Sequence, residues 1–159
     1  MQSAGLTKGA FYAHFASREA MIAEAVDRVM QHGQARIDHF FRVKKKPTVV
    51  EIADAWFDLE HIENLGDGCG ICLLAGEARY AGPEVRQVIA SYFEKNVEQI
   101  AQALGGGRAA TARATAILTA IVGAVSMARA VGNPKLTQTI LENTRVMVTH
   151  PAFLKRSRE

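Results

Sequence analysis

The sequence has few of the residues that mark disulfide-rich or β-rich proteins. Its 159 residues include two cysteines and four prolines. Two cysteines are too few for a disulfide scaffold. The strict alternation of polar and apolar residues that predicts strands is almost absent. The length fits one domain with an appendage, and a hydrophobic content of 48% is enough for a sizeable core.

The sequence also lacks a long apolar run. The stretch from Ala116 to Ala128 carries no charge, but it falls short of the ~20 apolar residues that a membrane span needs. No charged segment followed by an apolar one opens the chain, so a signal peptide is not expected. We therefore expect a cytoplasmic protein with no membrane partner.

Catalytic and metal-binding patterns are also missing. The five histidines are scattered, and no nucleophile, base and acid stand in a recognisable set, so we expect neither an enzyme nor a cofactor or metal site. Cys69-Gly70-Ile71-Cys72 is formally a C-x-x-C motif. A redox role would need a strand before it, and a zinc site would need ligands beyond His61. Two packed thiols are the favoured interpretation.

Apolar residues instead recur every three or four positions almost everywhere, which predicts an all-α fold. Capping residues, glycines and prolines set the expected ends of the helices. Ser17 and Asn133 are candidate N-caps, Thr48 and Glu51 form a capping box, and Pro83 suits a first helical position. The predicted helices cover 17–44, 48–63, 69–80, 83–104, 108–131 and 134–149, followed by a solvated tail at 155–159.

The stretch from Leu6 to Glu19 predicts a short helix, a break and the start of a long helix. Phe11 and Phe15 are four residues apart and share one face of the short helix. The other side carries Lys8, Tyr12 and His14 with small residues between them, which suits close approach to another surface. The net charge of +3 and the sequence pI of about 9.0 are compatible with nucleic acid but do not prove it.

This stretch resembles the second half of the helix-turn-helix of TetR-family transcriptional regulators. The resemblance is carried by Ala4-Gly5, by Tyr12-Ala13-His14-Phe15 and by Ser17-Arg18-Glu19. The family has two helices before this stretch, whereas three residues precede Ala4, so the resemblance implies a head without helix 1 and most of helix 2. It also implies the DNA-binding residues, which are Thr7, Lys8, Gly9, Tyr12, Ala13, His14 and Arg18.

The resemblance continues more weakly in the rest of the chain. Residues 68–78 and 83–86 look like the openings of helices 6 and 7 of the family's ligand-binding domain. The predicted helices 108–131 and 134–149 look like the two that form a four-helix dimer interface in that family. The implied organisation is a remnant helix-turn-helix head with its connecting helix at 1–43 and a ligand-binding and dimerisation domain at 44–159.

The implied function is a ligand-responsive transcriptional repressor whose DNA binding is relieved by a small-molecule effector. The alternative is a DNA-binding-deficient helical dimer that binds a small hydrophobic molecule, and an enzyme or redox protein comes third. For the pocket we expect aromatic and polar-tipped residues of the body, although core packing explains most of them equally well. They are Trp56, Phe57, His61, Cys69, Tyr80, Tyr92 and Phe93.

The helix 108–131 is apolar on too many sides for the surface of a monomer. We therefore expect a homodimer in which this helix packs against a symmetry mate. The residues expected to join it in the interface are Leu136, Ile140, Leu141 and Val148.

Overall fold

The computed structural model describes residues 12–58, 62 and 69–154, and these form an all-α fold without strands. The long helices are α2 (Arg18–Lys44), α6 (Pro83–Ala103), α7 (Arg108–Ala130) and α8 (Pro134–Thr149). The short ones are α3 (Val49–Trp56), α5 (Gly70–Leu74), the 3-10 helix η2 (Ala78–Tyr80) and α9 (Pro151–Leu154). The all-α prediction is confirmed.

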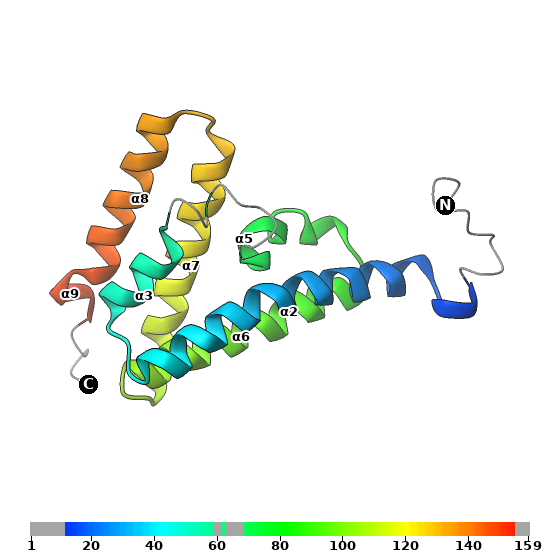
Figure 1. Ribbon diagram of the computed structural model, residues 1–159, viewed down its shortest axis with the longest axis horizontal. Coiled ribbons are helices and arrows are strands. Elements are labelled where there is room, and N and C mark those ends of the chain that lie inside the picture. Colours follow the sequence, from blue (N-terminus) through cyan, green and yellow to red (C-terminus); the bar gives the residue numbers. More distant parts are fainter. Residues whose placement is uncertain (1–11, 59–61, 63–68, 155–159) are drawn as a thin grey trace.

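The helices form two pairs. Helices α2 and α6 lie side by side and run in the same direction, while α7 and α8 form an antiparallel hairpin that rises steeply from them (Figure 1). Helix α3 packs on α8, where Arg145 pairs with Asp54, and α5 packs on α7 and α2. The start of α2 lies at the end of the molecule that is farthest from the hairpin (Figure 1).

The apolar core is centred on α7. One face of this helix buries residues spaced three or four apart, among them Ile117, Ile121 and Val125, which have no exposed surface. Ile52 of α3 and Ile100 of α6 pack into the same apolar core as these residues of α7. By length and composition α7 could also cross a membrane, but the core helix of a soluble bundle meets the same test.

A polar network joins α2 to α6 inside the bundle. Asn96, 2% exposed, donates from Nδ2 to Oε1 of Gln34 at 2.9 Å. Gln34 Nε2 donates in turn to Asp38 Oδ1 at 2.8 Å, and Gln99 and Lys95 also donate to this carboxylate. Partial burial raises the pKa of Asp38, but the three donors outweigh it and hold the pKa below its usual value.

The predicted helix starts are confirmed at four places. Ser17 accepts a hydrogen bond from Ala20 N at 2.9 Å and caps α2. Pro83 is the first residue of α6, and Asn133 caps α8 by accepting from Leu136 N at 3.1 Å. Thr48 opens α3 with a complete capping box, in which Glu51 N donates to Thr48 Oγ1 and Thr48 N donates to Glu51 Oε2.

Because Thr48 Oγ1 accepts a hydrogen bond from the first-turn N–H of Glu51, Thr48→Ala should lower the free energy of unfolding by about 1 kcal/mol. Urea unfolding followed by circular dichroism measures the change. Ser91→Ala is the matched control, since Ser91 is an exposed mid-helix hydroxyl that donates to Gln87 O and caps nothing. An equal loss in both variants would contradict the role given to Thr48.

Several predicted helix limits were wrong. The helix expected at 48–63 ends at Trp56, because Phe57 leaves the helical conformation at φ −93°, ψ 10°. The helix expected at 69–80 is divided into α5 and η2 by a turn at 75–77, which contains Gly76, a poor helix former. The helix expected at 134–149 has its predicted limits, and Pro151 begins a further short helix, α9, where Ala152 N donates to His150 Nδ1 at 3.2 Å.

Candidate functional site

A cavity of about 340 Å³ lies between the second half of α2 and the end of α3. Its apolar walls come from Ile37, Phe40 and Val43 on α2 and from Ala55 and Trp56 on α3. Gly33 and Cys69 complete the walls, and Arg36, His39, Lys44 and Asp58 add polar groups. The volume is at the lower end of the range for small-molecule sites, and the mixture of apolar walls with a few polar groups is typical of them.

Trp56 is the largest wall residue. It is 3% exposed, and its ring packs edge-on against Phe40 with centroids 6.5 Å apart. The indole N–H is buried and lies within reach of the Cys69 sulfur, where it helps to lower the pKa of that thiol.

Cys69 and Cys72 are both reduced and buried. The thiol of Cys72 donates to the sulfur of Cys69 and thereby lowers the pKa of Cys69 to about 6; burial opposes this change, and the backbone N–H groups of Cys72 and Ile71 support it. The pKa of Cys72 is raised, because its proton is held by Cys69 and because burial disfavours a second thiolate.

Cys69 should therefore become a thiolate at about pH 6, below the ordinary cysteine range of about pH 8.5. Because this side chain is 5% exposed, the thiolate is followed by its ultraviolet absorbance across a pH series, which needs no access for an alkylating reagent. Cys72→Ala removes the donor and should move the Cys69 profile toward the ordinary range. A wild-type Cys69 profile that rises only near pH 8.5, about the ordinary value, would contradict the assignment.

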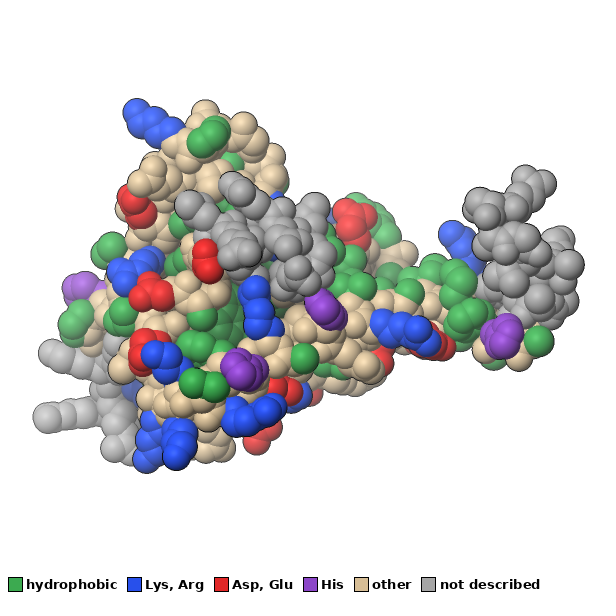
Figure 2. Space-filling view, viewed as in Figure 1, with side chains coloured by type: hydrophobic (Ala, Val, Ile, Leu, Met, Phe, Trp, Pro, Cys, Tyr) green, Lys and Arg blue, Asp and Glu red, His purple; other side chains and the backbone are tan. Residues whose placement is uncertain are grey.

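The described residues that line the cavity include two basic side chains, one histidine and one acidic side chain. Arg36, His39 and Lys44 are exposed on α2, and Asp58 is the acidic group among the lining residues. Lys44 Nζ also donates to Glu51 Oε1 at 2.9 Å. Basic and histidine side chains lie beside apolar surface on the face formed by α2 and α3 (Figure 2).

The predicted pocket residues do not gather around one cavity. Only Trp56 and Cys69 line the α2–α3 cavity, and His61 is outside the described residues. Phe57 lines a cavity of about 820 Å³ beside α8, Phe93 lines two others beside α7, and Tyr92 borders a void of about 10 Å³.

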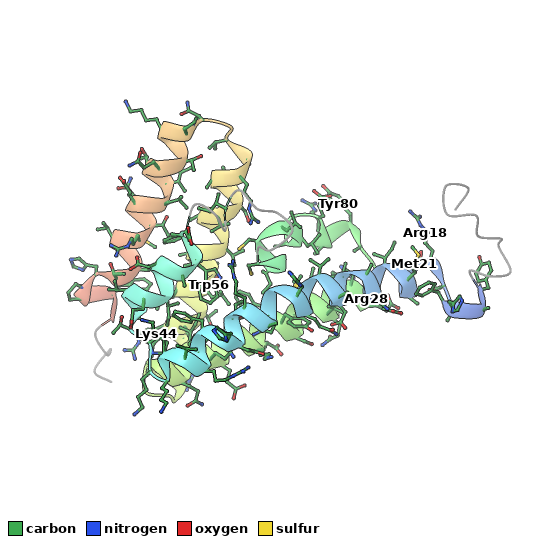
Figure 3. The ribbon with its side chains drawn as sticks, viewed as in Figure 1. Arg18, Met21, Arg28, Lys44, Trp56 and Tyr80 are labelled. Atoms are coloured by element: carbon green, nitrogen blue, oxygen red, sulfur yellow. The ribbon has the colours of Figure 1, made fainter. Side chains whose placement is uncertain are left out.

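Tyr80 was also predicted to line the pocket, but it lies at the surface. It is 77% exposed, and the Arg79 guanidinium lies 4.9 Å above its ring. It sits on the far side of α5 from Trp56, while Lys44 and Trp56 lie at the same end of α2 (Figure 3). The hypothesis that Tyr80 shares a pocket with Trp56 is therefore wrong for this structure.

The contribution of α2 to the cavity was not predicted from the sequence. Arg36, His39, Phe40 and Val43 follow the spacing of one helix face, at i, i+3, i+4 and i+7. This face mixes basic and apolar residues beside the buried stripe of Gly33 and Ile37. This mixture of residue types is the sequence signal that could have predicted a cavity beside α2, because a helix face that contacts only solvent would not be expected to include Phe40 and Val43.

Three of the predicted DNA-binding residues lie outside the described part of the chain; they are Thr7, Lys8 and Gly9. Residues 12–14 form the last described turn before α2, with Tyr12 65% exposed and both Ala13 and His14 exposed. Arg18 is the first residue of α2 and is also exposed. Arg18 and the cavity thus lie toward opposite ends of one helix (Figure 3).

One face of α7 is exposed although it carries no charge. Its members are small or apolar and follow the three-four spacing: Ala112, Ala116, Thr119, Gly123, Met127 and Ala130. Leu136, Val146 and Met147 of α8 are also exposed. We call these residues the α7–α8 face. Of the residues expected in a dimer interface, Leu141 and Val148 are instead buried within the chain, and Ile140 is partly buried.

Among the described residues, no group of three or more histidine, cysteine and acidic side chains is arranged to hold a metal ion. The α2–α3 cavity, which is open to solvent at its polar side, and the uncharged α7–α8 face are the most distinctive features of the described residues. A scan against protein-family models finds no match for this chain, and a search of curated proteins finds no match either.

Proposed function

We propose that this chain is a ligand-responsive transcriptional repressor of the TetR type, in which a small-molecule effector in the α2–α3 cavity relieves DNA binding. One observation supports this most directly. Helix α2 is a single helix of 27 residues that supplies seven of the cavity-lining residues and also begins with the exposed Arg18. A ligand that changes the position of α2 at the cavity therefore also changes the position of Arg18.

Such a response requires that the effector prefer one of two arrangements of α2. The lining of the cavity supports this requirement, because a ligand that fills it touches both α2 and α3 and so stabilises one arrangement of these two helices. The exposed positions of Tyr12, His14 and Arg18 support the DNA contact, since nothing described in the chain covers them.

Arg18→Ala should weaken the binding of all DNA sequences alike and lower the slope of log affinity against log salt by about one unit, because Arg18 is proposed to contact a phosphate. Fluorescence anisotropy of the whole gene product on the DNA upstream of its gene measures both quantities. Arg28→Ala is the matched control: Arg28 is exposed on the same helix but pairs with Glu24, away from the proposed head.

Equal effects of Arg18→Ala and Arg28→Ala would contradict a specific phosphate contact. No binding to any DNA by the wild-type gene product would remove the repressor proposal. The α2–α3 cavity would then favour the second function, a helical protein that binds a small hydrophobic molecule without DNA.

A further inference from the structure

Two thiols lie in contact at the start of α5. Cys69 directly precedes the helix and Cys72 is its third residue, so the two are three positions apart. Helical geometry at this spacing puts their Cα atoms about 5 Å apart, within the range that a disulfide requires. The thiol of Cys72 donates to the sulfur of Cys69, so the two side chains also point toward each other. A bond between the two sulfurs therefore requires little movement of the backbone.

Contacts with α2 and α7 hold this turn of the chain in place. A Cβ added at Gly70 would lie 2.9 Å from Sδ of Met30, because α5 approaches α2 closely at this point. On the other side, Ser126 Oγ of α7 donates to the backbone oxygen of Cys72 at 2.9 Å. Cys69 and Cys72 are each 5% exposed. The bundle therefore keeps the two thiols together and shields them from the thiols of other proteins.

The two thiols differ in access and in charge. Cys69 lines the α2–α3 cavity, which is open to solvent at its polar side, and Cys72 is not part of this lining. A molecule of about the size of water, such as hydrogen peroxide, fits easily into a cavity of about 340 Å³. The hydrogen bond from Cys72 lowers the pKa of Cys69 to about 6, so Cys69 is mainly a thiolate at neutral pH. Cys69 is therefore the nucleophile of the pair, and Cys72 holds the shared proton.

A positive charge beside the pair favours this charge state. The pKa of Cys72 is raised by its hydrogen bond to Cys69 and by burial, and the Arg129 guanidinium opposes this rise. Arg129 is fixed in position on α7, because its Nε donates to the backbone oxygen of Ile62 at 3.1 Å. A cation therefore balances the single negative charge on the pair although both sulfurs are buried.

We propose that Cys69 and Cys72 are an oxidation site at which a hydroperoxide converts the two thiols into one reversible disulfide. The Cys69 thiolate attacks a peroxide oxygen and the O–O bond breaks, which leaves a sulfenic acid on Cys69. The hydroxide that leaves takes a proton from the solvent. The sulfur of Cys72 then attacks the sulfur of Cys69, the S–O bond breaks, and hydroxide leaves with the Cys72 proton as water. With hydrogen peroxide, the two thiols lose two electrons in total and the peroxide becomes two molecules of water.

This oxidation is a modification that the proposed function neither requires nor includes. It also differs from a thioredoxin-like activity, in which the C-x-x-C motif exchanges with disulfides of other proteins and follows a strand. An internal disulfide needs only two sulfurs in contact and a small oxidant that reaches one of them. The all-α surroundings of Cys69 and Cys72 are compatible with this chemistry.

Treatment of the native chain with hydrogen peroxide at neutral pH tests the site. Acid quenching, unfolding and alkylation follow, so that burial does not limit the alkylating reagent. Peptide mass spectrometry should show that both thiols are lost together, that one bond joins Cys69 to Cys72 within one chain, and that dithiothreitol restores both thiols. The emission of Trp56, the only tryptophan, should change in step, because its indole lies within reach of the Cys69 sulfur.

Two variants separate the roles of the thiols. In Cys72→Ala no second thiol remains to form the disulfide, so Cys69 should be oxidised past the sulfenic acid to a sulfinic acid that dithiothreitol does not reverse. In Cys69→Ala, Cys72 should lose its thiol at least about tenfold more slowly than in the wild type. Cys69→Ala is also the matched control for the emission of Trp56, since peroxide oxidises methionines in both proteins.

The wild-type result decides the inference even if a variant does not fold. Retention of both thiols at millimolar peroxide would overturn it, and so would a disulfide that joins two chains. Loss of the Cys72 thiol in Cys69→Ala at the wild-type rate would overturn the role of Cys69 as the nucleophile. These measurements use neither DNA nor an effector, so their failure is distinct from a failure of the repressor proposal.

Discussion

Gly123→Glu should convert the homodimer that we propose for this protein to monomers. Gly123 lies in the middle of the α7–α8 face, where an added Cβ would meet no described atom within 4 Å apart from its chain neighbours and the backbone of its own helix. Glutamate is also a better helix former than glycine, so the substitution should not destabilise the single chain. In a two-fold interface the two copies would bring their carboxylates into one apolar contact, which should raise the dimer dissociation constant by at least about 100-fold.

Light scattering and sedimentation across a dilution series measure this change. Ala25→Glu is the matched control, since it places the same charge at an exposed position of α2 away from the α7–α8 face. The control should keep the wild-type mass. A wild-type protein with the mass of one chain at micromolar concentration would remove the dimer proposal, and an unchanged mass of Gly123→Glu would place the interface elsewhere.

Asn96→Leu should lower the free energy of unfolding by about 1–2 kcal/mol, because it leaves Oε1 of the buried Gln34 without its donor. The loss is moderated because the substitution also removes Asn96 Oδ1, a buried oxygen with no partner in the described chain. Adding Gln34→Met should restore part of the stability, since Oε1 of Gln34 is then no longer left without its donor, while Asp38 loses one donor but keeps Gln99 and Lys95.

The double-mutant cycle from urea unfolding at one fixed protein concentration measures this coupling. Fixed concentration matters because a dimer would make the apparent stability depend on the amount of protein. The two substitutions should be clearly less than additive. Additive losses would show that the contact between Gln34 and Asn96 contributes nothing of its own.

Local signals explain why most of the fold could be predicted. Ser17, Thr48 and Asn133 cap the helices that follow them, and each does so through a hydrogen bond to a residue three positions later. Such contacts depend on the adjacent sequence alone. The end of α3 at Trp56 has no glycine or proline to mark it, so the apolar spacing that continued past Phe57 gave too long a helix.

The site was harder to predict because it depends on packing between helices distant in sequence. Trp56 and Cys69 were identified as pocket residues from their types, and they do line one cavity. Phe93 and Tyr80 have similar types but lie beside α7 and at the surface, respectively. No local sequence pattern shows which side of α2 faces α3. The contribution of Phe40 and His39 to the cavity depends on that contact between the two helices.

The hydrogen bonds from Asn96 and Gln99 to α2 also restrict how the molecule can move. Sliding α2 along α6 by one helical turn, about 5.4 Å, would break every bond between Gln34, Asp38 and their partners on α6. Rotation of the two helices as one rigid unit breaks none of them. Arg18 lies fifteen residues before Gly33, or about 22 Å along the axis, so a rotation of about 5° centred at the cavity displaces Arg18 by about 2 Å.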